Sequence, residues 1–105
     1  MVESVTGKVT VKEVLYEDVG NGAVVVYKIE NNDDKLPFSD FYIATFDDTA
    51  GEEVWGAGST SETALESASM EWDREVGYYE NPFRKVLEKL TLEKLNQAKN
   101  ILRNF

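Results

Sequence analysis

The spacing of apolar residues changes once along this chain, near Gly58, and that change constrains the fold more than any other feature. Before Gly58 the apolar residues alternate with polar ones or form short runs, which is typical of strands. After it they recur every three or four residues, which is typical of helices. A length of 105 residues suits one domain. We therefore predict a single α+β domain over 1–105, with a β-rich half at 1–58 and a helical half at 59–105.

The first half predicts four strands that form two antiparallel hairpins. Asn21-Gly22 between the first two strands is typical of a type I′ turn, which needs positive φ at both positions. The alternation slips at Glu13, which indicates a bulge or the end of the first strand. Trp55 is the largest side chain expected in the buried part of the sheet. The predicted strands are 8–12, 23–30, 41–46 and 52–57.

The second half predicts two or three helices packed on one face of that sheet. Ser59-Thr60-Ser61-Glu62 fits a capping box, in which a hydroxyl and a carboxylate satisfy free amides at a helix start. Gly77 is expected to end this first helix. Its apolar stripe consists of Ala64, Leu65, Ala68, Trp72 and Val76.

A second helix is expected to start at Asn81-Pro82, because proline is tolerated at the first helical position. Its apolar stripe is Phe83, Val86, Leu87 and Leu90, and a further stripe follows at Leu92, Leu95, Ala98, Ile101 or Leu102, and Phe105. The two stripes are out of register. This favours a break at Thr91, which would cap a third helix; a continuous helix over 82–104 is the alternative.

The residue types needed for most catalytic and metal sites are missing. The chain has no histidine and no cysteine, which removes Ser-His and Cys-His nucleophiles and the usual zinc, copper and iron–sulfur ligands. Gly56-Ala57-Gly58 lacks the third glycine of a nucleotide-binding loop and is interpreted as a strand-to-helix turn. The acidic loops lack the pattern of a calcium-binding loop. We expect no enzymatic activity, no cofactor and no metal.

The same composition favours a cytoplasmic protein. Residues 1–5 contain neither the basic nor the apolar region of a signal peptide. The longest apolar run, 23–27, is far shorter than the ~20 residues of a membrane-spanning helix. The lack of cysteine suits a reducing compartment. We therefore expect no membrane association.

Charge is unevenly distributed along the chain, whose net charge is −9. Residues 1–80 contain 18 acidic and 5 basic residues, whereas 81–105 contain 2 acidic and 6 basic ones. An acidic body repels nucleic-acid phosphates and attracts basic partners. The sequence therefore favours a basic protein partner, such as a nucleic-acid-binding enzyme, over direct binding of nucleic acid. An acidic surface that only maintains solubility is an equally good interpretation.

Two groups of aromatic residues were considered as contact sites. Tyr42, Phe46 and Trp55 could stack on bases, but the acids around them favour packing in the core instead. Tyr78 and Tyr79 lie between the two helical stretches. They could anchor a partner protein or close the end of the core.

Residues 41–72 contain a strand that ends in an aspartate turn, a second strand and a capped helix start. The residues that mark them are Phe46-Asp47-Asp48, Gly51 and Gly58-Ser59-Thr60, followed by Glu62, Ala64-Leu65 and Ala68. In this order of strand, aspartate turn and helix start, the segment resembles the N-terminal domain of HicB-type antitoxins. The resemblance implies a small sheet with a helix on one face. It also implies neutralisation of a small basic RNA-cleaving toxin by covering it.

These observations lead to a hypothesis of a non-enzymatic acidic inhibitor that blocks a basic nucleic-acid-processing enzyme, as antitoxins and phage anti-defence proteins do. A basic groove binds dense negative charge whatever molecule carries it, so nucleic-acid mimicry is one form of this hypothesis. The predicted contact residues are Asp33, Asp34, Asp47, Asp48, Glu52, Glu53, Glu62, Glu66, Asp73, Glu75, Tyr78 and Tyr79.

Two other functions were weighed. The main alternative is a structural or oligomerising module without an inhibitory role. In that module the basic C-terminal segment would dock on the acidic body of a second protomer, in a homodimer, or on its own body. A small enzyme that uses two converging carboxylates is a third possibility.

Overall fold

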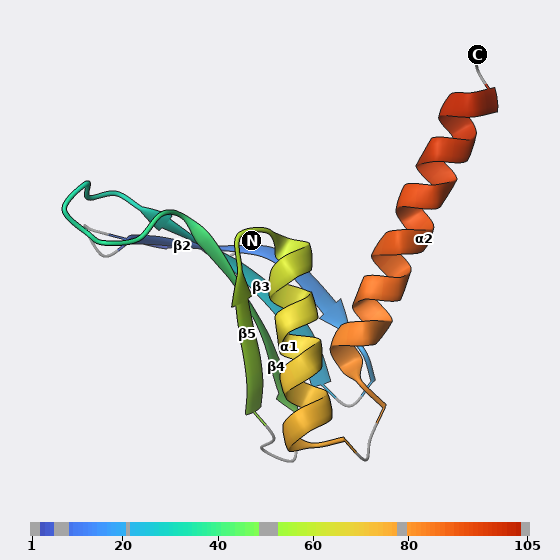
Figure 1. Ribbon diagram of the computed structural model, residues 1–105, viewed down its shortest axis with the longest axis horizontal. Coiled ribbons are helices and arrows are strands. Elements are labelled where there is room, and N and C mark those ends of the chain that lie inside the picture. The colour runs from blue at the N-terminus through green and yellow to red at the C-terminus, as the bar shows by residue number, and fades with distance from the viewer. Residues whose placement is uncertain (1–2, 6–8, 21, 49–52, 78–79, 104–105) are drawn as a thin grey trace.

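The protein is a five-stranded antiparallel sheet with two helices on one of its faces (Figure 1). The computed structural model describes residues 3–5, 9–20, 22–48, 53–77 and 80–103. The strands lie in the sheet in chain order, and both helices come after β5 in the sequence. Their bounds are β1 Glu3–Val5, β2 Val9–Asp18, β3 Gly22–Asn31, β4 Phe41–Asp48, β5 Glu53–Gly58, α1 Ser61–Glu75 and α2 Pro82–Arg103.

The predicted α+β class is therefore confirmed, and the helices number two. The four predicted strands correspond to β2–β5. The short edge strand β1, which pairs Ser4 with Val11, was not predicted. Three residues are too few to show alternation, so β1 is defined by its pairing with β2 and not by a local pattern.

The slip in alternation at Glu13 is a bulge within a continuous strand. The pairing of β2 with β3 shifts between Glu13 and Leu15, so Val14 has no direct partner. Because the bulge adds one residue to β2, positions three apart lie on the same face across it. Lys12 and Leu15 point to one face of the sheet, whereas Glu13 and Tyr16 point to the other.

The connection from β2 to β3 differs from the predicted type I′ turn. In this connection the described glycine with positive φ is Gly20, at 102°, whereas Gly22 already belongs to β3. The Asp18 carboxylate accepts a hydrogen bond from the Gly20 amide at 2.8 Å. The Val19 amide donates to the Gly22 carbonyl at 3.0 Å. Asn21 lies outside the described residues.

The core lies between the helices and one face of the sheet. Phe46 of β4 packs edge-to-face against Trp72 of α1 at 5.3 Å and against Phe83 of α2 at 6.3 Å between ring centroids. The stripe predicted for α1 is buried throughout. Phe83 and Val86 are buried as well, and Leu87 and Leu90 pack against this core. The two helical stripes predicted from residues 64–90 are therefore confirmed.

Helix α1 lies unusually close to β5 because two glycines face it. A Cβ built on Gly56 would stand 2.2 Å from the Ala68 amide nitrogen, and one on Gly58 would stand 2.4 Å from the Thr63 hydroxyl. Gly56-Ala57-Gly58 thus ends β5, and the interpretation of these residues as a strand-to-helix turn is wrong. Their function is to let the helix backbone approach the sheet.

The cap of α1 uses different residues from those predicted. Thr60 is the N-cap, and its hydroxyl accepts from the Thr63 amide at 3.1 Å. The Thr63 hydroxyl accepts from the Thr60 amide at 2.9 Å, so a threonine completes the box that the sequence assigned to Glu62. At the other end Gly77, with φ of 67°, donates to the Trp72 carbonyl, which confirms the predicted helix stop.

Asn81 joins the two helices. Its side-chain carbonyl accepts from the amides of Phe83 and Arg84, which caps α2. Its amide group donates to the Ser69 carbonyl at 3.0 Å and to the Ser69 hydroxyl at 2.9 Å. With 5% of its surface exposed, Asn81 is a buried polar link that fixes the start of α2 against α1.

Helix α2 is continuous from Pro82 to Arg103, so the predicted break at Thr91 is wrong. The Thr91 hydroxyl donates to the Leu87 carbonyl at 2.9 Å within the helix and does not cap a new one. At 100° per residue, the stripe of the second half is rotated by roughly 90° from that of the first half. The change of register reflects a change in what the helix faces. The first half packs on the core and the second half projects beyond it (Figure 1).

Replacement of Gly56 by alanine should destabilise the fold, because the new methyl group would meet the backbone of α1. We expect a loss of about 2–4 kcal/mol in the free energy of unfolding, measured with urea. Ala57→Ser at the exposed neighbouring position should change stability by less than ~0.5 kcal/mol. Equal stability of Gly56→Ala and the native chain would contradict the close approach described above.

Replacement of Asn81 by alanine should also be costly, because it removes the cap of α2 and leaves the buried Ser69 groups without their donor. We expect a loss of about 2–3 kcal/mol in thermal or urea unfolding. Asn96→Ala is the matched control: it makes the same chemical change on the exposed second half of α2, where it should be neutral or slightly stabilising.

Candidate protein-interaction surfaces

The acids of α1 face the bases of α2 within the same chain. Lys94 forms an ion pair with Glu62, and Arg84 forms one with Asp73 at 2.6 Å. Lys89 pairs in the same way with Glu17 of β2, whose charge and hydrogen bond raise the pKa of Lys89 above its usual range. The basic C-terminal segment therefore docks on the acidic body of its own chain. Glu62 and Asp73, both predicted contact residues, take part in that docking.

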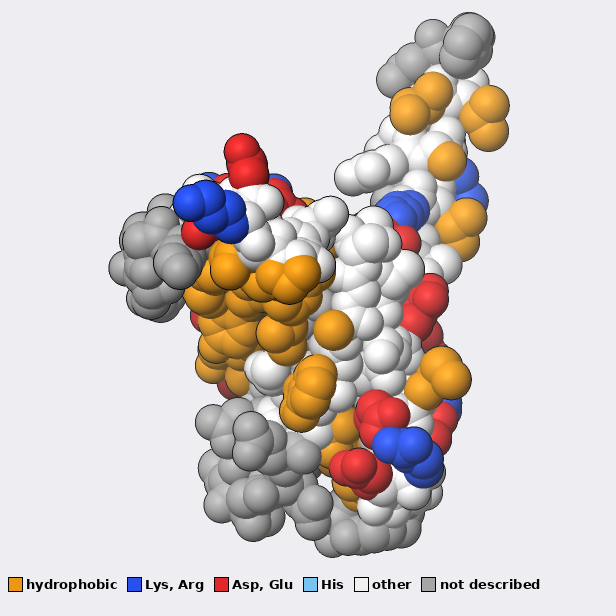
Figure 2. Space-filling view, turned by 60° about the vertical axis from the view of Figure 1, so that its left-hand side comes forward, with side chains coloured by type: hydrophobic (Ala, Val, Ile, Leu, Met, Phe, Trp, Pro, Cys, Tyr) orange, Lys and Arg blue, Asp and Glu red, His pale blue; other side chains and the backbone are white. Residues whose placement is uncertain are grey.

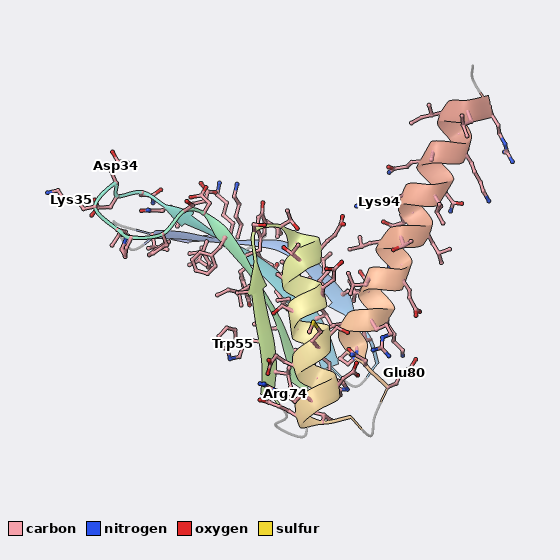
Figure 3. The ribbon with its side chains drawn as sticks, viewed as in Figure 1. Asp34, Lys35, Trp55, Arg74, Glu80 and Lys94 are labelled. Atoms are coloured by element: carbon pink, nitrogen blue, oxygen red, sulfur yellow. The ribbon has the colours of Figure 1, made fainter. Side chains whose placement is uncertain are left out.

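The other predicted acids on described side chains do not converge. Glu66 is exposed on α1, and Glu75 lies 3.9 Å from Arg74. Asp33 has a local structural role, because its carboxylate accepts from the Lys35 amide at 2.9 Å in the β3–β4 loop. Asp34 is exposed at the tip of that loop, far from α1 (Figure 3). These four residues are spread over the molecule.

For the remaining predicted contact residues the structure gives only partial information. The backbone register places Asp47 of β4 opposite Glu53 of β5, and Asp48 opposite Gly22. The side chains of Asp47, Asp48 and Glu53 are not described. Glu52, Tyr78 and Tyr79 lie outside the described residues.

The face of the sheet opposite the helices is also apolar. Residues on this face alternate with the core residues Val24, Val26, Ala44, Phe46 and Val54, so they point away from α1 and α2. Three rows of cross-strand partners on this side are largely apolar, and we call these three rows the outer sheet face: Tyr16–Val25–Thr45–Trp55, Glu13–Tyr27–Ile43–Ala57 and Val11–Ile29–Phe41. The backbone register places an acidic row on the same side, next to the row of Trp55: Asp18–Ala23–Asp47–Glu53.

Trp55 is a large apolar side chain on this face that is mostly exposed. The sequence predicts it as the largest buried residue of the sheet, and this is wrong: 58% of Trp55 is exposed, whereas Trp72 is 1% exposed and fills the core. Trp55 projects from β5 away from α1 (Figure 3). Because Phe46 and Trp55 lie on opposite faces, Tyr42, Phe46 and Trp55 do not form a common base-stacking surface.

The outer sheet face is continuous and has almost no charge. Figure 2 shows hydrophobic side chains gathered on one side of the molecule. Among the eleven residues of the three rows, Glu13 alone is charged. An antiparallel sheet with one solvated face normally presents polar residues there. Contiguous exposed apolar surface is typical of a contact site.

One signal in the sequence pointed to this face. Residues 23–27 are apolar at both parities. A continuous apolar run is typical of a strand covered on both sides, whereas a strand with one solvated face alternates. The run 23–27 therefore indicates that the second face of the sheet is apolar as well.

A groove of about 460 Å³ runs between the edge strand β5 and α1, beside Trp55. Arg74 lies within it, 2.5 Å from the Glu71 carboxylate and 3.9 Å from that of Glu75. Both acids of the groove therefore lie beside the same guanidinium group, which pairs closely with Glu71 and more distantly with Glu75. This arrangement does not provide the two free converging carboxylates that an acid–base site requires.

The second half of α2 presents another apolar surface. Leu92, Leu95, Ile101 and Leu102 are exposed along it, interspersed with Lys99 and Arg103. All residues from 91 to 103 are exposed. The stripe is short, about three helical turns.

Searches for membrane and metal sites gave negative results for the described residues. Neither helix in the described ranges has the length and hydropathy needed to cross a bilayer. Within the same ranges, side chains that could ligate a metal do not gather in groups of three or more.

The chain was compared with known families, curated proteins and solved structures. No family model matches it, and no significant match was found among curated proteins or solved structures.

Proposed function

We propose that this chain is a non-enzymatic protein-binding module and that the outer sheet face is its contact surface. The observation that carries the proposal is the set of three cross-strand rows of apolar side chains left uncovered by the helices. Burial of apolar surface is the main favourable contribution to protein association, at roughly 25 cal/mol per Å².

The composition of the outer sheet face supports this proposal. The centres of protein interfaces are depleted of charge and enriched in tyrosine and tryptophan. Trp55 and Tyr16 are 58% and 60% exposed, and both belong to the row that crosses Val25. Large rigid aromatic side chains lose little conformational entropy on binding, so they are well suited to anchor a partner.

A photo-crosslinking amino acid at position 55 tests the proposal directly. Installed in the native host, it should form a covalent adduct with a protein, because position 55 lies in the contact surface. Met70 is the matched control position: its side chain is 73% exposed, but it lies on α1 and not on the outer sheet face. Position 70 should give little or no adduct.

The comparison of the two positions gives a clear outcome. An adduct at position 55 in at least roughly tenfold excess over position 70 supports the proposed surface, since surface contacts with no preferred site would label both. Equal labelling at both positions, or labelling at position 70 alone, would exclude the outer sheet face as the contact surface.

An acidic inhibitor of a basic nucleic-acid-processing enzyme, antitoxin-like or of the anti-defence type, is the second candidate function. Its support is the net charge of −9, which steers a basic partner toward the chain. Among the predicted contact residues that α2 does not pair, those with exposed, described side chains are Asp34, Glu66 and Glu75; Glu75 also lies 3.9 Å from Arg74. Glu62 and Asp73 contribute less, because they already pair with α2.

This second function predicts binding that salt and charge removal both weaken. A triple variant with Asp34→Asn, Glu66→Gln and Glu75→Gln should lose at least roughly tenfold in affinity for a captured basic enzyme, and about 0.5 M NaCl should have a comparable effect. The native chain should inhibit the captured enzyme in a direct assay. Binding that withstands both treatments would exclude the electrostatic mechanism.

A further inference from the structure

We infer that the molecule covering the outer sheet face is a second copy of this chain, in a homodimer with the two sheets face to face. The inference rests on the proposed function and names its partner. It derives from the surface area of the chain, its shape, and the distribution of charge around the face.

The isolated chain exposes more surface than a monomer of its mass should. Its accessible surface is 7187 Å². A folded monomer of 11.9 kDa is expected to expose about 5,900 Å², so the excess is about 1,200 Å². A standard interface buries roughly 800 Å² on each partner, and homodimers commonly bury more. The projecting second half of α2 contributes to this excess together with the outer sheet face, and the total is large enough to include one protomer's share of a stable dimer.

The shape of the chain agrees with its surface area. Its radius of gyration is 15.7 Å, whereas a compact domain of this length has about 13 Å. Its extents are 47 × 42 × 23 Å, in part because the second half of α2 projects beyond the core, and the helices cover one face of the sheet (Figure 1). A sheet that is apolar on both faces requires a third layer. The described part of the chain places no helix on the outer face.

A second sheet is the natural third layer. A twofold axis through the centre of the face, near Tyr27, would bring the same rows of both protomers into contact. Packed sheets lie ~10 Å apart with their side chains interdigitated, and Tyr27, Ile43 and Val25 would form the centre of that layer. Such a contact closes on itself, so it produces a dimer and not a filament.

The charges restrict how two copies can meet. Each copy carries a net charge of −9, so two copies repel over most of their surfaces. The three rows of the outer sheet face are the region where this repulsion is weakest, because Glu13 is their one charged residue, whereas the row with Asp18, Asp47 and Glu53 lies at one end of the contact. Added salt should therefore strengthen the dimer by screening the repulsion. This is opposite in sign to the salt effect expected for binding of a basic partner.

Sedimentation equilibrium of the full chain tests the inference. From about 1 to about 100 µM, the average mass should rise toward twice 11.9 kDa, and about 0.5 M NaCl should lower the dissociation constant. Tyr27→Lys would place a charge in the dry centre of the interface. It should raise the dissociation constant at least about 100-fold.

Two further variants keep this test decisive. Trp55→Ser removes apolar surface from the same face without adding charge, and it should weaken the dimer by roughly tenfold or more. Leu102→Lys adds the same charge as Tyr27→Lys on the exposed second half of α2 and should leave the dimer intact. Circular dichroism and thermal unfolding would verify that each variant folds like the native chain.

Each outcome supports or overturns the inference. Dissociation by Tyr27→Lys and Trp55→Ser but not by Leu102→Lys supports it. A native chain that stays monomeric over the whole range overturns it, and so does a dimer that Leu102→Lys alone dissociates. A monomer that still forms an adduct with another protein at position 55 would reject the second copy but keep the protein-binding function. A monomer that forms no adduct at position 55 would contradict both the homodimer and the protein-binding function.

Discussion

The structure depends on the close packing of α1 against the sheet at Gly56 and Gly58. Because neither glycine has a side chain, the helix backbone can lie directly on β5, and Trp72 reaches Phe46 and Phe83 in the core. This contact decides which face of the sheet is covered. It also leaves the opposite face, with Trp55 and Tyr27, available to another molecule.

The charge asymmetry of the chain has an internal explanation. Three bases of α2 pair with acids of α1 and β2, so part of the opposite charge is used to orient α2 on its own body. Exposed ion pairs contribute roughly 0–1 kcal/mol each, less than the burial of Phe83 and the links made by Asn81. Charge therefore orients α2, whereas apolar contacts and the Asn81 hydrogen bonds hold it. Among the described side chains, the predicted contact acids that remain exposed are dispersed, and this favours the apolar outer sheet face over charge as the basis of the functional proposal.

Much of the fold could be predicted because it depends on local patterns. The period of two in β2–β5, the bulge after Glu13, the stripe of α1 and the stop at Gly77 were all visible in the sequence. The errors concern long-range contacts. Trp55 and Trp72 are both large aromatic residues in regular elements, and their local sequence does not say which one meets the core. The shift of register in α2 was visible too, but it indicated a break where the helix in fact changes its surroundings.

The sequence by itself determined strands β2–β5, helix α1, the start of α2 and the presence of two distinct sides on each of these strands, since these follow from backbone geometry and from residues a few positions apart. Only the tertiary structure decided which side of the sheet the helices cover and which acids meet the bases of α2. The physical reason is that alternation makes two faces equivalent until a distant element packs on one of them. Here the glycines of β5 place α1 on one face, and the apolar rows on the other face are left uncovered by the helices.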